Sequence, residues 1–238
     1  INSVSDTFSD YNGRISIEFR GSSSLHFPKK QYALETQTLL GNNNNVSLLG
    51  LPVENDWILS APYSDKSLMR NFLTYNLGRK MNRYYSPRTV FCELIINDDY
   101  KGVYILTEKL KRDNDRINIA KLDSNDLGGD SLTGGYIFKI DKFSQDSTEY
   151  WISNLPGKNG SPVLFQYYYP KPSEMQPQQL NYIKNYVHSF EYNLNSSFFS
   201  DPVIGYQKYI DINSFIDYYI INEFVRNVDA YTYSTYMY

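Results

Sequence analysis

The residues best suited to chemistry in this sequence are cationic and hydroxyl side chains that gather around one predicted turn. The group begins at Arg20, continues through 21–24 (GSSS) and ends at Lys29 and Lys30. Arginine can bind phosphate oxygens through two parallel hydrogen bonds, lysine supplies a point charge, and glycine lets backbone amides approach an anion. The turn could therefore bind phosphate, although the same composition is typical of a solvated hairpin tip.

Two acidic residues stand where predicted elements end. Glu108 ends a predicted strand on the face of Tyr104 and Leu106. It could lie at a hinge and bind a base amine or a lysine, or it could pair with Lys111. Asp229 lies between a predicted helix and the last predicted strand, a position suited to a catalytic base or metal ligand because rigid elements aim it. Taken alone, the residue is explained more simply by an Asx turn, which Asp forms readily.

Several other kinds of catalytic centre are excluded by the sequence. It contains no GxxxxGK[ST], GxGxxG, HExxH or GxSxG motif. The two histidines, His26 and His188, have no obvious catalytic partners, which argues against a histidine-dependent triad. Cys92 is the single cysteine, so the chain holds neither an internal disulfide nor a cysteine-based zinc site.

Composition indicates a folded protein rather than a binder of anionic polymers. The 238 residues are 41% hydrophobic and 21% charged, with a net charge of -3, which does not suggest a nucleic-acid or anionic-membrane partner. The sequence contains no apolar run of about 18 residues, the length that would predict a transmembrane helix. The 24 tyrosines leave a protein-binding or carbohydrate-binding surface open. The chain starts without Met or an apolar signal segment, so we expect that a signal peptide was removed or the sequence was trimmed.

Hydrophobic periodicity predicts a β-rich first part with one helix. The expected strands are 14–20, 30–36 and the hairpin 89–96 and 102–108, whose loop would be the five residues 97–101. The expected helix spans about 65–81, with an apolar stripe of Leu68, Met69, Phe72, Leu73, Leu77 and Met81.

The second part adds strands at 134–141 and 163–169, then becomes helical after a proline-punctuated linker. Helices are expected at 177–194 and 213–226, the latter with an apolar stripe of Phe215, Ile216, Tyr219, Ile220 and Phe224, and a last strand at 231–238. These elements predict an α+β fold with a β-rich nucleotide-binding lobe at 1–169 and a helical lobe at 170–238. A cleft between two such lobes would be a natural ligand site.

Six short motifs, in order along nearly the whole chain, resemble the CotH kinase family, the spore-coat protein H-like kinases. They are Arg20-Gly-Ser-Ser-Ser with Phe27-Pro-Lys-Lys-Gln-Tyr32, Asp56-Trp57-Ile-Leu, Tyr63-Ser-Asp65-Lys-Ser-Leu68-Met-Arg70-Asn71, Tyr100-Lys-Gly102-Val-Tyr104-Ile-Leu-Thr-Glu108-Lys, Gly134-Gly135-Tyr136-Ile-Phe-Lys139, and Asn222-Glu223 with Asn227-Val-Asp229.

The resemblance implies an atypical protein-kinase-like fold that transfers the γ-phosphoryl group of ATP, with Mg²⁺ or Mn²⁺, to Ser or Thr of a protein. Lys29 or Lys30 would contact the phosphates, with Arg20 in the same group, and Glu108 would lie near the hinge and nucleotide. Asp229 would be the catalytic base. The resemblance also implies a bacterial protein that is secreted or at the cell surface. It leaves the protein substrate and the oligomeric state open.

The sequence departs from the kinase pattern in two places. Conventional kinases have a metal-binding Asn five positions after the catalytic Asp, and here that position is Ser234, a weaker metal ligand. The family pattern also continues to a Trp-Asp-Phe-Asp-like segment that supplies a metal-binding Asp, and the chain stops at Tyr238, before it. We therefore expect the chain as printed to lack a main Mg²⁺ ligand, which leaves two functions open: a kinase, or a non-catalytic surface or coat-assembly module.

Overall fold

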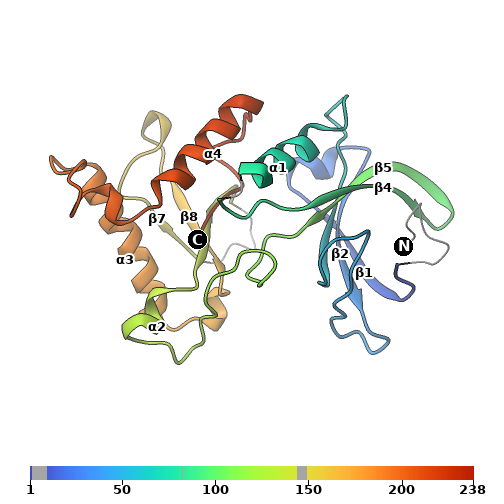
Figure 1. Ribbon diagram of the computed structural model, residues 1–238, viewed down its shortest axis with the longest axis horizontal. Helices are drawn as coiled ribbons and strands as arrows, with labels where there is room; N and C mark the ends of the chain where they lie inside the picture. The colour runs from blue at the N-terminus through green and yellow to red at the C-terminus, as the bar shows by residue number, and fades with distance from the viewer. Residues whose placement is uncertain (2–9, 82, 144–148) are drawn as a thin grey trace. The chain divides into compact units, whose positions relative to one another are not determined.

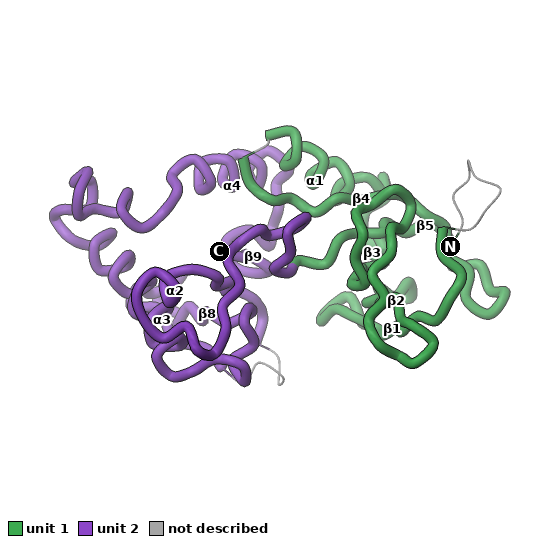
Figure 2. Tube along the Cα trace, turned by 60° about the horizontal axis from the view of Figure 1, so that its bottom comes forward, with its two compact units in different colours: residues 1–110 green, residues 111–238 purple. Residues whose placement is uncertain are grey.

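A computed structural model describes residues 1, 10–81, 83–143 and 149–238 of the chain. The chain forms two compact units, residues 1–110 and 111–238 (Figure 2). This division differs from the predicted lobe boundary at 169/170. Side chains before that boundary, Trp151 and Phe165, share a hydrophobic core with Ile183 and Val187 after it. The boundary lies earlier than predicted because the second unit is itself a sheet packed on a helix.

The first unit is built on an antiparallel sheet. Among the described residues its strand order is β1-β2-β3-β5-β4. The bounds are β1 Arg14–Arg20, β2 Gln31–Gln37, β3 Asp56–Ser60, β4 Thr89–Ile96 and β5 Asp99–Glu108 (Figure 1). The fully buried Trp57 of β3 and Tyr104 of β5 lie in its core, with Leu48 from the preceding loop. Sequence patterns predicted four of these strands but not β3, which is a short, mostly buried strand without alternation.

The β4–β5 hairpin is tighter than expected. The predicted five-residue loop is wrong, because β5 starts at Asp99 and only Asn97 and Asp98 form the turn. Both residues have positive φ angles, 52° and 62°, as a type I′ turn requires. The register shifts at Leu94/Ile95, so the hairpin absorbs the extra residue as a bulge rather than as a longer loop.

Helix α1 spans Arg70–Met81 and begins five residues later than predicted. The Asp65 side chain accepts hydrogen bonds from the backbone amides of Ser67 and Arg70, at 2.9 and 2.8 Å, and Leu68 has a φ of +61°. These contacts form a turn before the helix. The predicted apolar stripe is not buried: Leu73 is 47% and Leu77 38% exposed within the structure.

The second unit contains another antiparallel sheet, ordered β7-β8-β6-β9 among the described residues. Its strands are β6 Ile137–Ile140, β7 Tyr150–Ile152, β8 Leu164–Tyr169 and β9 Thr235–Met237. Phe138, Trp151 and Phe165 pack with helix α3, while Lys139 and Gln166 alternate to the opposite face. The predicted last strand, 231–238, is shorter because Tyr231 and Ser234 have φ angles of +67° and +52°.

Helices α2, α3 and α4 span Gly129–Thr133, Pro177–Leu194 and Ile212–Val225, and short 3₁₀ turns lie at Ser23–His26, Lys158–Gly160, Pro172–Glu174 and Tyr206–Lys208. Helix α3 starts with a capping box between Gln176 and Gln179 and buries Ile183 and Val187. Asp211 precedes helix α4, and its carboxylate caps the first turn by accepting from the amides of Asn213 and Ser214. The stripe predicted to be apolar packing on α4 is exposed, from 44% at Phe215 to 76% at Phe224.

The fold is therefore mixed α+β, as the sequence predicted, with an antiparallel sheet in each unit. The second unit is less helical than predicted because β6, β7 and β8 belong to it. No described helix has the length and apolar character needed to cross a lipid bilayer.

Candidate functional site

The cations predicted to bind phosphate lie in the first unit and have different surroundings. The Lys29 ammonium donates a 2.6 Å hydrogen bond to the Val103 carbonyl and lies 4.7 Å from the centre of the Tyr104 ring. The Lys30 ammonium donates to the Leu25 carbonyl, also at 2.6 Å, and so folds back on its own turn. Arg20, at the end of β1, is exposed. Lys29 is therefore bound to the sheet, whereas Lys30 stays with the turn.

Gly102 makes room for Lys29. Its φ is +83°, and a Cβ atom added there would lie 3.3 Å from the Lys29 nitrogen. Burial lowers the pKa of Lys29 from its ordinary value. Among the described residues no carboxylate pairs with Lys29, and two of its three donor hydrogens remain for another acceptor.

Glu108 is almost completely buried, with 1% of its surface exposed. Its Oε2 accepts hydrogen bonds from the Arg88 backbone amide at 2.7 Å and the Tyr85 hydroxyl at 3.1 Å, and its Oε1 accepts from the Arg88 guanidinium at 2.9 Å. The carboxylate thus ties β5 to the segment that leads into β4. Neither Arg88 nor Tyr85 was singled out from the sequence, because no local spacing links them to Glu108.

Asp229 lies in an exposed turn between α4 and β9. Its backbone amide donates to the Asn227 side chain at 3.2 Å, and its carbonyl accepts from the amides of Thr232 and Tyr233. In the part of the chain that the structure describes, its carboxylate has no hydrogen-bond or ion-pair partner. The side chain that accepts a backbone hydrogen bond in this turn is that of Asn227, not that of Asp229, so the Asp229 carboxylate stays available as a proton acceptor.

Ser234 contacts an acid that the sequence analysis missed. Its backbone amide and hydroxyl donate to Oδ1 of Asp141, at 3.2 and 3.4 Å. The other oxygen of Asp141 accepts from the Lys139 ammonium at 3.0 Å. Burial alone would raise the pKa of Asp141, but Lys139 and the amides of Lys142 and Ser234 outweigh it and hold that pKa below its usual value.

A signal for Asp141 was present in the sequence. It follows Lys139 by two positions in a strand motif, so both side chains share one face of the sheet. What the sequence did not show is that β9 pairs beside β6, with Lys139 opposite Tyr236 and Ile140 opposite Thr235. That pairing brings Ser234 to Asp141.

The structure thus groups Arg20, Lys29, Lys30 and Glu108 within the first unit, and Asp229 and Ser234 within the second. The described residues include no cluster of three or more His, Cys, Asp or Glu side chains that could hold a metal ion. A cavity of about 620 Å³ lies elsewhere, at the end of α3, where Glu191, Tyr192 and Phe198 contribute to its wall. None of the predicted site residues lines it.

Comparison with protein families gives one match. The family model described as CotH kinase protein matches residues 17–238. This range includes every site residue predicted from the sequence. No curated protein matches the chain.

Proposed function

Because the chain belongs to the CotH kinase protein family, we propose that it is part of an ATP-dependent phosphotransferase that acts on Ser or Thr of a protein. Its location, on this proposal, is outside the bacterial cell or at its surface. The observation that carries the proposal beyond the family is the carboxylate of Asp229, exposed and without a partner among the described residues, on a turn between a helix and a strand.

The proposed reaction assigns one role to each unit. In the second, Asp229 accepts the proton of the substrate hydroxyl as its oxygen forms a bond to the γ-phosphorus, while the bond from that phosphorus to the β–γ bridging oxygen breaks and ADP leaves. In the first, Lys29 offers a positive charge and free donors to phosphate oxygens, with the exposed Arg20 and the half-buried Lys30 as weaker contributors.

The described residues do not form a ready Mg²⁺ or Mn²⁺ site. Ser234, at the position of the kinase metal ligand, donates its hydroxyl to Asp141, and Asp141 is neutralised by Lys139. The proposal of ATP with Mg²⁺ or Mn²⁺ as cofactors therefore rests on the family, and we derive no step through the metal.

Phosphate transfer from labelled ATP to a Ser-rich peptide, in Mg²⁺ or Mn²⁺, tests the proposal on the full natural chain. We expect Asp229→Ala to lower the rate by about 10²- to 10⁴-fold, the usual contribution of a general base. Asp130→Ala, at an exposed acid on α2, is the matched control and should keep the rate. Transfer by the Asp229→Ala variant at the wild-type rate would remove Asp229 from the mechanism.

A second candidate is a non-catalytic surface or coat-assembly module that kept the family fold. The observation that favours it is the engagement of Glu108 by Arg88 and Tyr85, which uses the group expected beside the nucleotide for structure. Titration with ATP separates the two candidates. A module without nucleotide function would bind ATP no better than its Lys29→Ala/Lys30→Ala variant, whereas a kinase would lose affinity on that change.

A further inference from the structure

The turn that carries Asp229, residues 226–234, is fastened where it leaves α4. Arg226 ends the helix in the left-handed conformation, with a φ of +51°. The Asn227 backbone amide donates to the Asn222 carbonyl at 3.0 Å, and the Asn227 side chain donates to the Asn222 side-chain oxygen at 2.8 Å. Asn222 is buried, so this amide pair fixes the first end of the turn to a rigid position.

The other end of the turn is held by Asp141, the residue directly after β6. Oδ1 of Asp141 accepts three hydrogen bonds, from the Ser234 amide, the Ser234 hydroxyl and the Lys142 amide at 2.9 Å. Lys139 holds Oδ2 of Asp141, and both side chains are about four-fifths buried, at 20% and 21% exposed. Partial burial strengthens these charged contacts relative to the same contacts in water.

The backbone of the turn adopts unfavourable φ angles that require stabilising contacts at both ends. Tyr231 and Ser234 are not glycines, yet their φ angles are +67° and +52°. Residues with a Cβ atom adopt this region at a cost and persist there only when their surroundings dictate it. The Tyr231 hydroxyl donates to Glu223 at 2.9 Å, which supports the first of these residues, and Asp141 supports the second.

We propose that Asp141, held in place by Lys139, is a positioning residue that fixes the turn carrying Asp229 through its contact with Ser234. This inference rests on the proposed function, because it makes Asp141 matter to catalysis without contact to substrate. It also gives Ser234 a role as the attachment point of the turn. The Lys139 ammonium lies 5.9 and 6.0 Å from the centres of the Tyr168 and Tyr236 rings, which limit its movement.

Kinetics and hydrogen exchange of graded variants test the inference. Asp141→Ala removes every bond to Ser234, and Asp141→Asn keeps an acceptor but loses the ion pair. We expect kcat to fall by about 10- to 100-fold for the alanine variant, less for asparagine, with the KM for ATP and peptide unchanged, as for a misplaced catalytic group. Lys139→Met should resemble Asp141→Asn. Asp123→Ala, which breaks an exposed ion pair of the same unit at 2.8 Å, is the control.

The exchange measurement does not depend on activity. We expect the Ser234 amide to exchange at least about ten times faster in Asp141→Ala, while amides of α3 keep their protection. An unchanged Ser234 amide, or faster exchange throughout the second unit in all three variants, would overturn the inference. So would unchanged kcat in an active enzyme. If the wild-type chain transfers no phosphate, the proposed function fails, and the Ser234 amide alone decides whether Asp141 holds the turn.

Discussion

Replacing Glu108 by Gln separates a structural role of this residue from a nucleotide-binding one. The change keeps the size of the side chain and one oxygen acceptor but removes the charge. Three donors from Arg88 and Tyr85 converge on the carboxylate within 3.1 Å. The oxygen of a glutamine can accept from the donors that one carboxylate oxygen of Glu108 accepts from. Its NH₂ group would then face a donor at the position of the other oxygen, and that donor would lose its acceptor.

The expected loss of unfolding free energy depends on how deeply Glu108 and Arg88, the two partners of the ion pair, are buried. Removing one partner of a fully buried ion pair costs about 3–5 kcal/mol. The Arg88 side chain is 37% exposed and can turn to water, which reduces that figure. A buried donor left unsatisfied costs about 1–3 kcal/mol. We therefore expect Glu108→Gln to lower the free energy of unfolding of the first unit by about 2–3 kcal/mol.

Urea unfolding with tryptophan fluorescence measures this loss. The sequence has two tryptophans, and Trp57 of the first unit lies opposite Glu108 in the β3–β5 register. In a Trp151→Phe background, Trp57 alone reports the first unit. A slope of about 1–3 kcal/mol per molar urea converts the loss into a midpoint lowered by about 0.7–3 M. Asp99→Asn, which breaks the exposed Lys101–Asp99 pair, is the control and should leave the midpoint unchanged.

A Glu108→Gln midpoint within about 0.3 M of its parent would show that the contacts of Arg88 and Tyr85 with this carboxylate add little stability. Unchanged stability together with a large loss of ATP affinity would instead place Glu108 beside the nucleotide. A destabilised variant that binds ATP normally, below its unfolding transition, would assign the residue to the structure of the unit.

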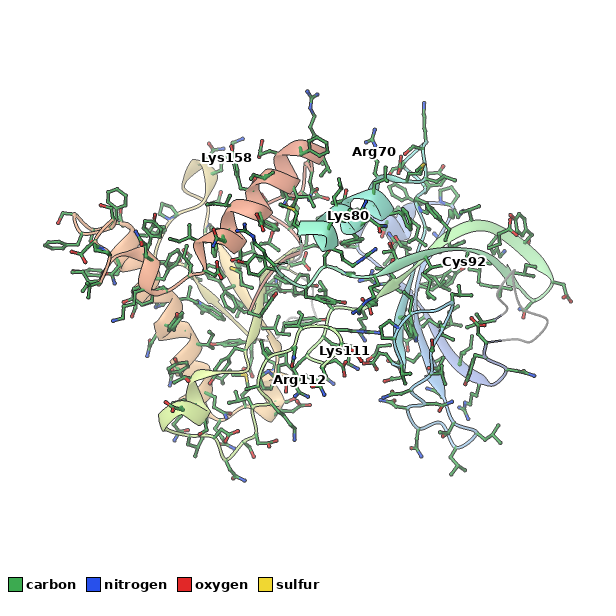
Figure 3. All side chains as sticks on the ribbon, in the orientation of Figure 1. Arg70, Lys80, Cys92, Lys111, Arg112 and Lys158 are labelled. Carbon is green, nitrogen blue, oxygen red and sulfur yellow. The ribbon has the colours of Figure 1, made fainter. Side chains whose placement is uncertain are left out.

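Three further predictions concern other sites. Burial raises the pKa of Cys92, on β4 (Figure 3), to about 11. At pH 8 iodoacetamide should therefore react with the Cys92 thiol roughly 100 times more slowly than with an exposed thiol. Reaction of Cys92 at the rate of an exposed thiol would contradict its burial. Gly102→Ala places a Cβ in the left-handed region and should cost about 1–2 kcal/mol by thermal unfolding. Gly50→Ala, at another positive φ with open space, carries the same backbone cost, so any larger loss at Gly102 measures the contact with Lys29, and a smaller loss would contradict it. Because the pKa of Asp141 is lowered, its charge stabilises the second unit above the ordinary Asp pKa of about 3.9, and this stabilisation is lost as the pH falls further. The free energy of unfolding of the second unit, followed by Trp151 fluorescence, should therefore decrease less steeply at acid pH in Asp141→Asn than in the parent. An unchanged decrease would refute this role of Asp141.

Periodicity predicted the elements that obey it. The alternating strand at Arg14–Arg20, strand β4 and helix α3 have the predicted bounds, and β5 ends at Glu108 as predicted but begins three residues earlier, at Asp99. Prediction failed where tertiary contacts decide the outcome. Helix α1 starts late because the Asp65 side chain captures the amides of Ser67 and Arg70, a competition that local propensity does not show.

The candidate site could be predicted as a list of residues but not as a set of contacts. Lys29, Glu108 and Asp229 were found because charged residues at turns and element ends stand out in a sequence. The partners of the site residues could not be found, because they lie far away along the chain. Lys29 bonds Val103, which is 74 residues away, and Ser234 bonds Asp141, which is 93 residues away. Such pairings depend on strand order, which a single sequence does not encode in any local spacing.

The fastening of residues 226–234 also bears on how this chain can change over evolutionary time. Asn222, Glu223 and Asp141 all belong to the unit that carries Asp229, so the shape of the turn is inherited with that unit. Substitutions around Lys29 can then accumulate and alter what the first unit binds while the turn keeps its conformation. A lineage could in this way give up or exchange a ligand in one step and recover it in another, without rebuilding the turn each time.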